Sequence, residues 1–378
     1  MQTITTALLS LLVENAGRDF GMAETLPPAV YHDPGIHDLE LEKIFRRDWI
    51  CLGRLAEIPA PGDYLCRDIA ASPVIVVRQK DGSVKALANI CAHRATRLLE
   101  CDGHVSRISC PYHSWTYAID GQLIGAPFMQ DTPGFDIARY RLKELACDTW
   151  EGFIYVSLDT NAQSLATRLG ALTDLVGDFR MADYVPVFSQ VDTWDANWKC
   201  LVENYMDAYH IHRVHKNSFG KYGASEDWTK LFDGEDAFSY HYVQEDEDPR
   251  SVSAHPNNTW LKGDNRNRTY LINIFPAHTI QLQPDMLWYL SILPQGTECL
   301  EVRWGVSIPG EILEAAAVKQ EHIDDLMQLL HQVNSEDQPI VENLGRSTRS
   351  PEATRGPLSY LERNVWQFGR YLSRALSA

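Results

Sequence analysis

Two short pairs of cysteine and histidine could hold a metal centre. Cys91 and His93 flank a single residue, and Cys110 and His113 follow after an interval of sixteen residues. A structural zinc site with two thiolates and two imidazoles needs the same ligands, but zinc fingers pair Cys with Cys and His with His. Mixed pairs are typical of a two-iron cluster in which thiolates hold one iron and imidazoles hold the other. The pattern therefore favours an iron–sulfur cluster over zinc.

A second group of side chains able to bind metal lies between residues 203 and 215. On a regular helix Glu203, Asp207 and His210 fall at i, i+4 and i+7, which places them on one face. His215 follows five residues after His210, about 140° further round at ~3.6 residues per turn. The two histidines can bind one metal only if the helix ends or bulges between them. By spacing alone, a metal site and exposed histidines near a helix end both explain this stretch.

The composition is that of an acidic globular protein. The 378 residues are 44% hydrophobic and 22% charged, and the net charge is −17. Such a charge repels a phosphate backbone, so we expect no nucleic-acid partner. The most apolar N-terminal stretch, residues 7–13, is too short to span a bilayer and lacks the basic flank of a signal peptide, so we expect no membrane association. The eight cysteines are too sparse for a disulfide scaffold, which predicts a reducing, cytoplasmic location.

Turn signals and hydrophobic periodicity predict the elements that must position these groups. Short strands between Gly, Asp and Pro turns predict an all-β domain over residues 45–160, with strands at 63–67, 73–78, 84–89, 107–109, 115–118 and 153–157. The remainder, residues 161–378, mixes strands at 269–275, 279–282, 286–293 and 299–308 with helices at 162–175, 198–212, 312–332 and 358–376. We therefore predict an α+β domain in which helices cover an antiparallel sheet.

Both motifs resemble those of one family, the Rieske non-heme iron oxygenases. The two Cys/His pairs fit the Rieske pattern C-x-H…C-x-x-H, and residues 114–117 and 120–121 resemble the version found in the oxygenases. Ala95 departs from the glycine that the family usually has at that place. Residues 203–215 match the catalytic-domain signature D/E-x3-D-x2-H-x4-H at every fixed position. The resemblance implies an all-β Rieske [2Fe-2S] domain and a helix-grip (START-like) catalytic domain, on which a helical segment of residues 1–44 packs.

The resemblance also assigns residues to two cofactors. Cys91, His93, Cys110 and His113 would hold a Rieske [2Fe-2S] cluster. His210 and His215 would hold a mononuclear non-heme Fe(II). The third iron ligand would be Asp337, from a segment at 336–342 that is similar to the family's E-D-x4-E, with Glu336 as its nearest rival.

Asp207 would have a different role from the ligands. In the family, the matching carboxylate bridges a Rieske histidine of one subunit to an iron-bound histidine of the next. Carried over to this chain, the bridge would run from His113 through Asp207 to His210, which implies a head-to-tail homotrimer. Glu203 and Asn204 would orient the ligands by hydrogen bonds.

The function implied by the resemblance is that of a terminal oxygenase component. Electrons from NAD(P)H would come from a separate flavin and iron–sulfur reductase, in some systems through a ferredoxin, and would be used with O2 on a small-molecule substrate. The chain length resembles that of homotrimeric members that oxidise quaternary ammonium compounds, which favours monooxygenation or N-demethylation of a small polar substrate. Aromatic ring dioxygenation is the alternative. An electron carrier, or a non-catalytic ligand-binding module with a structural zinc, would account for fewer of the motifs.

A substrate pocket is expected between residues 269–293 and the helix of residues 207–215. Six side chains are candidates for its lining: Tyr270, Phe275, His278, Gln281, Trp288 and Tyr289. Ordinary sheet core is the alternative for each of them. Strand alternation places Trp288 and Tyr289 on opposite faces of the sheet but does not indicate which face borders the pocket.

Overall fold

The computed structural model describes residues 2–218, 229–244, 253–314 and 320–377. The chain divides into two units, one formed by Phe45–Leu165 and the other by Met1–Ile44 together with Ala166–Ala378. The N-terminal segment thus belongs to the same unit as the second half of the chain. None of the described helices is both long and apolar enough to cross a lipid bilayer.

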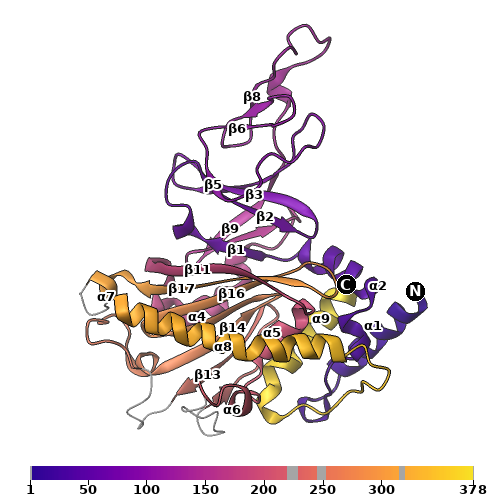
Figure 1. The fold of residues 1–378 in the computed structure, drawn as a ribbon, viewed down its shortest axis with the longest axis vertical. Helices are drawn as coiled ribbons and strands as arrows, with labels where there is room; N and C mark the ends of the chain where they lie inside the picture. The colour runs from indigo at the N-terminus through magenta and orange to yellow at the C-terminus, as the bar shows by residue number, and fades with distance from the viewer. Residues whose placement is uncertain (1, 219–228, 245–252, 315–319, 378) are drawn as a thin grey trace. The chain divides into compact units, whose positions relative to one another are not determined.

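The unit of Phe45–Leu165 is built from antiparallel strands. Its larger sheet has the order β1-β10-β9-β4-β3-β2-β5 and its smaller sheet the order β6-β7-β8 (Figure 1). The strands are β1 (Ile50–Arg54), β2 (Asp63–Ile69), β3 (Ser72–Arg78), β4 (Val84–Ala88), β5 (Gly103–His104), β6 (Ile108–Ser109), β7 (Thr116–Tyr117), β8 (Leu123–Gly125), β9 (Glu144–Trp150) and β10 (Phe153–Ser157). All six predicted strands are present. Four further strands, β1, β5, β8 and β9, were not predicted. The longest of them, β9, gives little signal because its polar and apolar residues do not alternate regularly.

The other unit contains a seven-stranded antiparallel sheet. Its strand order is β11-β17-β16-β15-β14-β13-β12, so that β13 to β17 form a meander in chain order. The strands are β11 (Tyr184–Trp194), β12 (Thr229–Leu231), β13 (Phe238–Gln244), β14 (Arg268–Ile274), β15 (His278–Gln283), β16 (Met286–Pro294) and β17 (Leu300–Pro309). The helices are α1 (Gln2–Ala16), α2 (Pro34–Glu40), α3 (Leu165–Arg168), α4 (Gly170–Val176), α5 (Trp198–Met206), α6 (Ile211–Val214), α7 (Gly310–Glu314), α8 (Gln320–Ser347) and α9 (Arg363–Ser377). An antiparallel sheet covered by helices confirms the α+β prediction.

Three helices cover one face of this sheet. The Tyr205 ring of α5 meets Trp288 of β16 with 6.1 Å between centroids, and His331 of α8 meets Trp304 of β17 at 5.1 Å. Tyr371 of α9 stacks at 4.6 Å on Phe275, which follows β14. This helix-covered face therefore carries three of the six candidate pocket residues, Phe275, Gln281 and Trp288, because Gln281 lies opposite Trp288 in the ladder.

The remaining candidates lie on the opposite face. The ladder pairs place Tyr270, His278 and Tyr289 there, and Tyr270 packs edge-on against Phe179 from the segment that precedes β11. These three side chains are sheet core.

The predicted helix over residues 198–212 is wrong at its C-terminal end. The Asn197 side chain caps the start of α5 by accepting a hydrogen bond from the Lys199 backbone N–H. The helix ends at Met206, and Asp207 has an extended backbone. The Asp207 carboxylate accepts a hydrogen bond of 2.6 Å from the Tyr209 N–H, which closes a local turn and prevents the helix from continuing.

The other predicted helices also differ in extent. The one over 162–175 is divided into α3 and α4. The one over 312–332 corresponds to α7 and the first part of α8, and residues 315–319 lie outside the described residues.

A buried ion pair ties the N-terminal segment to α5. Lys199 and Glu40 are both fully buried, and the Lys199 ammonium lies 2.6 Å from a Glu40 carboxylate oxygen. The second Glu40 oxygen accepts a hydrogen bond of 2.9 Å from the Trp198 indole. Because an unpaired buried charge is costly, this pairing fixes α2 against the helix that leads to the candidate site.

Candidate metal centres

Three side chains from two distant segments meet in one place. His210 and His215 flank the short helix α6, and Asp337 lies in α8. The Nε2 atoms of the two histidines are 3.2 Å apart, and Asp337 Oδ1 lies 3.2 Å from His215 Nε2 and 3.6 Å from His210 Nε2. The end of α5 at Asp207 is what allows two histidines five residues apart to point at one position.

The spacing of these atoms fits ligands of one metal ion. Two ligands about 2.1 Å from an ion and at right angles to each other are about 3 Å apart. Two neutral imidazoles and one carboxylate on the same side of an ion leave other positions open, which is the ligand set of non-heme Fe(II) oxygenases. The residues present therefore fit the mononuclear iron.

The neighbouring carboxylate, Glu336, has a different place from Asp337. Its Oε2 lies 2.9 Å from His215 Nδ1, and the Ser218 hydroxyl donates to the same oxygen at 2.6 Å. A carboxylate behind a ligating histidine fixes the tautomer that presents Nε2 to the metal. Burial lowers the pKa of His215, but its interactions with Asp337 and Glu336 outweigh burial and raise the pKa overall.

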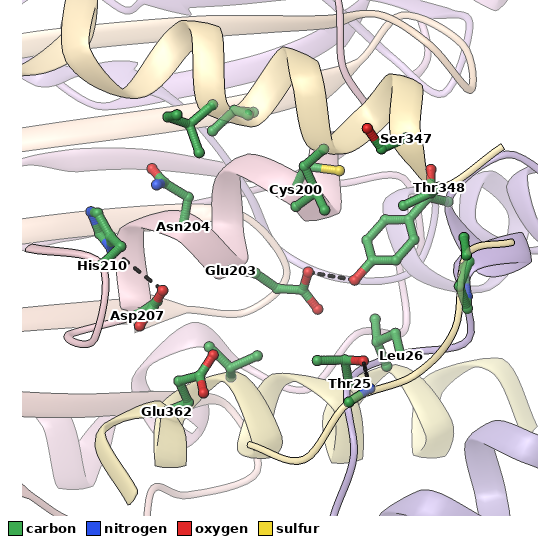
Figure 2. A pocket seen from close by; sticks show the side chains of 18 of the residues that line it. Thr25, Leu26, Cys200, Glu203, Asn204, Asp207, His210, Ser347, Thr348 and Glu362 are labelled. Carbon is green, nitrogen blue, oxygen red and sulfur yellow. Dashed lines mark hydrogen bonds and ion pairs between the residues drawn. The ribbon is translucent and has the colours of Figure 1, made fainter. Parts of the chain in front are cut away.

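Asn204 also supports the ligands, because its amide donates to Asp337 Oδ1 at 3.3 Å. Glu203 does not. Its carboxylate accepts a hydrogen bond of 2.6 Å from the Tyr31 hydroxyl, and burial raises its pKa to about 7 (Figure 2). The expectation that Glu203 orients the ligands is therefore not matched by its contacts. No sequence motif marks Tyr31, which lies in a turn of the N-terminal segment.

Asp207 lies beside the candidate iron ligands and borders an open cavity. Its Oδ2 is 3.5 Å from His210 Nδ1, at the distance of an ion pair rather than of a hydrogen bond. Figure 2 shows these two side chains at the wall of a cavity of about 520 Å³ whose lining also includes Glu203, Asn204 and Glu362. Asp207 thus lies close to a candidate iron ligand and lines the cavity together with it.

The four predicted cluster ligands lie in two facing loops of the other unit. Cys91 and Cys110 are buried, whereas His93 is exposed and His113 is partly exposed. The two imidazole rings lie 4.8 Å apart, and the His93 ring stacks on Trp115 at an angle of 9°. His113 Nδ1 is buried and has no hydrogen-bond partner among the described residues. A buried ring nitrogen without a partner, in loops that also supply two buried thiols, fits a [2Fe-2S] cluster held by two cysteines and two histidines.

Tyr117 supports one of the cluster thiols. Its hydroxyl lies 3.2 Å from Cys91 Sγ and accepts a hydrogen bond of 3.0 Å from the Ala92 N–H. Donors to cluster sulfur atoms raise the reduction potential. Two other side chains in this region have separate roles, because Cys101 is exposed and His104 pairs with Asp63 at 2.8 Å.

The two cluster loops share one backbone conformation. In each, the fourth residue after the cysteine donates its N–H to the cysteine carbonyl, Ala95 to Cys91 and Ser114 to Cys110. Both residues have positive φ, 55° for Ala95 and 59° for Ser114. This left-handed conformation favours glycine, which explains why Ala95 is a departure from the family pattern.

Comparison with known families identifies a domain for each predicted cofactor. Residues 148–378 match the ring hydroxylating alpha subunit (catalytic domain), and residues 48–141 match the Rieske [2Fe-2S] domain. The chain belongs to the ring-hydroxylating α-subunit family. Its two cofactors are accordingly a Rieske [2Fe-2S] cluster and a mononuclear iron, as predicted from the motifs.

Individual relatives are similar over about half of the chain. The glycine betaine monooxygenase oxygenase subunit of Chromohalobacter salexigens is 36% identical over 210 residues, 54% of this chain and 46% of that protein. The carnitine monooxygenase oxygenase subunit of Escherichia coli K12 is 30% identical over 208 residues, 54% of this chain and 56% of that protein. The chain thus spans about half the length of the curated relatives that it matches.

Solved structures share the fold along nearly the whole chain. The quaternary ammonium Rieske monooxygenase CntA in complex with L-carnitine has a TM-score of 0.80 at 21% identity, covering 96% of this chain and 97% of that one. Naphthalene 1,2-dioxygenase from Rhodococcus sp. has a TM-score of 0.79 at 22% identity, covering 98% and 97%. These similarities confirm the predicted fold, a Rieske domain together with a helix-grip catalytic domain.

Proposed function

We propose that the protein is the terminal oxygenase component of a Rieske oxygenase system that monooxygenates or N-demethylates a small quaternary ammonium compound. The observation that supports the oxygenase function is the convergence of His210, His215 and Asp337, whose ligand atoms lie 3.2–3.6 Å apart. An electron carrier would not need this second site. The substrate class is supported by the glycine betaine and carnitine monooxygenase subunits among the relatives.

In this proposal each candidate residue has a defined task. His210, His215 and Asp337 hold the mononuclear iron, and Glu336 and Asn204 orient His215 and Asp337. Cys91, His93, Cys110 and His113 hold the cluster. When bound, the cluster supplies electrons and the mononuclear iron supplies the activation of O2. Asp207 holds a proton between histidines, with His210 on one side and the cluster histidine of another copy on the other.

A head-to-tail homotrimer is part of the proposal. Asp207 lines an open cavity, and His113 is partly exposed in its own loop. Complementary half-sites of this kind are completed when one copy presents its cluster loop to the cavity of the next. Inter-subunit electron transfer is described for the quaternary ammonium monooxygenase in one of the similar structures. The electrons would come from a separate reductase, in a cytoplasm whose reducing conditions suit eight cysteines that form no disulfide.

Aromatic ring dioxygenation is the second candidate. The α subunit of biphenyl dioxygenase from Metapseudomonas furukawaii is 34% identical over 200 residues. The helix-covered sheet face presents Trp288 and Phe275, which could stack on an aromatic ring as readily as they could surround a methylammonium group.

The test begins with protein purified anaerobically. We expect about three irons per chain, two for the cluster and one for the mononuclear site, and a rhombic EPR signal of low average g after reduction by dithionite. Oxygen uptake with a reductase would then be compared for glycine betaine, carnitine and naphthalene. A colourless protein with one zinc and no iron would contradict the proposal and favour the ligand-binding module. Uptake with naphthalene alone would favour the dioxygenase.

A further inference from the structure

The helix-covered face of the sheet contains a row of buried polar side chains without partners. Ser239, Asn273 and Thr279 lie opposite one another on the adjacent strands β13, β14 and β15. All three are fully buried. The two hydroxyls and both polar atoms of the Asn273 amide have no hydrogen-bond partner in the described part of the chain. Nearly all buried polar groups in folded proteins are paired, so an aligned row of unpaired ones calls for an explanation.

Two aromatic side chains extend this row towards the candidate iron site. The Tyr205 hydroxyl lies close to Thr279, and the Tyr205 ring meets that of Trp288. The Trp288 indole N–H is likewise buried and unpaired within the described ranges, and the buried Tyr205 hydroxyl has the Thr279 hydroxyl as its neighbour. Tyr205 directly follows Asn204, whose amide donates to Asp337. Tyr205, at this end of the row, is therefore adjacent in α5 to a residue that contacts a candidate iron ligand.

The chemistry of the row defines what it can bind. All five side chains can donate a hydrogen bond, through three hydroxyls, one amide and one indole. None of them carries a formal charge. The arginines of strands β13 to β17 lie on the opposite face, because Arg268 is two residues from Tyr270 in β14 and Arg303 is paired with Ser291 in the ladder. His241 lies on the same face as the row, two residues from Ser239, and burial lowers its pKa to about 4, so its imidazole is neutral. Neutral donors bind oxygen atoms by hydrogen bonds rather than by ion pairing.

We infer that Ser239, Asn273 and Thr279, with Tyr205 and Trp288, form a subsite that binds the oxygen-bearing tail of the substrate. The two aromatic rings lie where they can also contact an attached ammonium group. The inference rests on the proposed function for the identity of the ammonium group. It adds that a carboxylate or hydroxyl tail is required for tight binding and is recognised by neutral hydrogen-bond donors rather than by a cationic side chain.

The test measures binding to the iron-loaded protein by isothermal titration calorimetry. Glycine betaine and tetramethylammonium share a quaternary ammonium group but differ in the carboxylate tail. We expect glycine betaine to bind at least about tenfold more tightly. The isosteric substitutions Asn273→Leu and Thr279→Val should each reduce this preference by about tenfold while changing tetramethylammonium affinity less than about twofold. Thr279→Ser, which restores a hydroxyl, should recover the preference.

A matched pair of variants separates the subsite from general effects of a buried hydroxyl. Ser239 and Ser307 are both fully buried with unpaired hydroxyls, but Ser307 lies on the opposite sheet face, across from Leu287. Ser239→Ala should weaken glycine betaine binding, and Ser307→Ala should not. Removing an unpaired buried polar group should not lower the melting temperature of either variant, so a loss of affinity reports on binding.

The outcomes for the subsite and for the proposed function are distinguishable. Equal measurable affinity for glycine betaine and tetramethylammonium would overturn the subsite, as would equal effects of Ser239→Ala and Ser307→Ala on glycine betaine binding. Benzoate and toluene form a second pair that differ in a carboxylate, and the subsite would also be overturned if neither benzoate nor glycine betaine bound. Turnover of glycine betaine with no dependence on the row would leave the function standing and the subsite wrong. If benzoate bound in preference to toluene and Asn273→Leu removed that preference, while glycine betaine was neither bound nor oxidised, the subsite would stand and the proposed substrate would be wrong.

Discussion

The strained loop after His93 gives a prediction whose sign and size follow from the backbone. Ala95 has φ 55°, and a left-handed conformation costs a residue with a Cβ about 1–2 kcal/mol. Glycine removes this cost but loses roughly 0.5–1 kcal/mol more through its greater freedom in the unfolded chain. The substitution Ala95→Gly should therefore stabilise the protein by about 0.5–1 kcal/mol, or raise its melting temperature by about 2–4 °C.

The neighbouring Ala92 provides the control. It lies in the same exposed loop, between the two ligands Cys91 and His93, and is not among the residues with positive φ. Ala92→Gly should destabilise by a similar amount, because only the entropic cost remains.

The assay heats the iron-loaded protein and follows the visible absorbance of the cluster together with far-UV circular dichroism. Opposite shifts for the two variants are expected. A melting temperature that falls in both would refute the argument from backbone strain.

Three further predictions concern the candidate sites. Asp207→Ala should keep both metal centres but abolish turnover driven by the reductase, as measured by iron content and O2 uptake; retained turnover would exclude the bridging role. Glu336→Gln should lower the iron affinity of the mononuclear site by about 10–100-fold, measured by competition with a chelator, while the cluster absorbance stays unchanged; an unaltered affinity would remove Glu336 from the site. Burial raises the pKa of Glu203 from 4.5 to about 7. Because the folded protein holds the Glu203 proton more tightly than the unfolded chain, the protonated carboxyl contributes its full stabilisation below pH 4.5. This contribution is lost as the pH rises through 7. Glu203→Gln should accordingly gain up to roughly 3 kcal/mol over wild type between pH 5 and pH 8 in urea unfolding, and parallel pH profiles would contradict this.

The cluster ligands could be predicted from sequence because each pair is local. Cys91 and His93 occupy one turn, as do Cys110 and His113, so that spacing alone indicates how each loop can hold a metal. Asp337 lies more than one hundred residues after His215, and only the family resemblance pointed to it. Its neighbour Glu336 is also a carboxylate. The two residues differ in the side of His215 that each contacts, Nε2 for Asp337 and Nδ1 for Glu336, and sequence spacing does not predict this difference.

Two features of the catalytic unit were beyond sequence reasoning for physical reasons. The end of α5 depends on a hydrogen bond from the Tyr209 N–H to the Asp207 side chain, which competes with a helix that the periodicity allows. The face of β16 that borders the helices was ambiguous because its residues are buried on both sides of the sheet. Alternation of polar and apolar residues carries no information in such a strand.

The buried pair of Glu40 and Lys199 determines where the chain can be cut if the catalytic unit is to be fused to a different Rieske domain. Both family matches begin after residue 47, so a designer who cuts at those boundaries would discard Glu40 and keep Lys199. The remaining ammonium would be stranded in an apolar interior at a cost of about 3–5 kcal/mol, a large part of the stability of a typical domain. A chimera that exchanges Rieske domains should therefore insert the new domain between residues 44 and 166 and retain the first 44 residues of this chain.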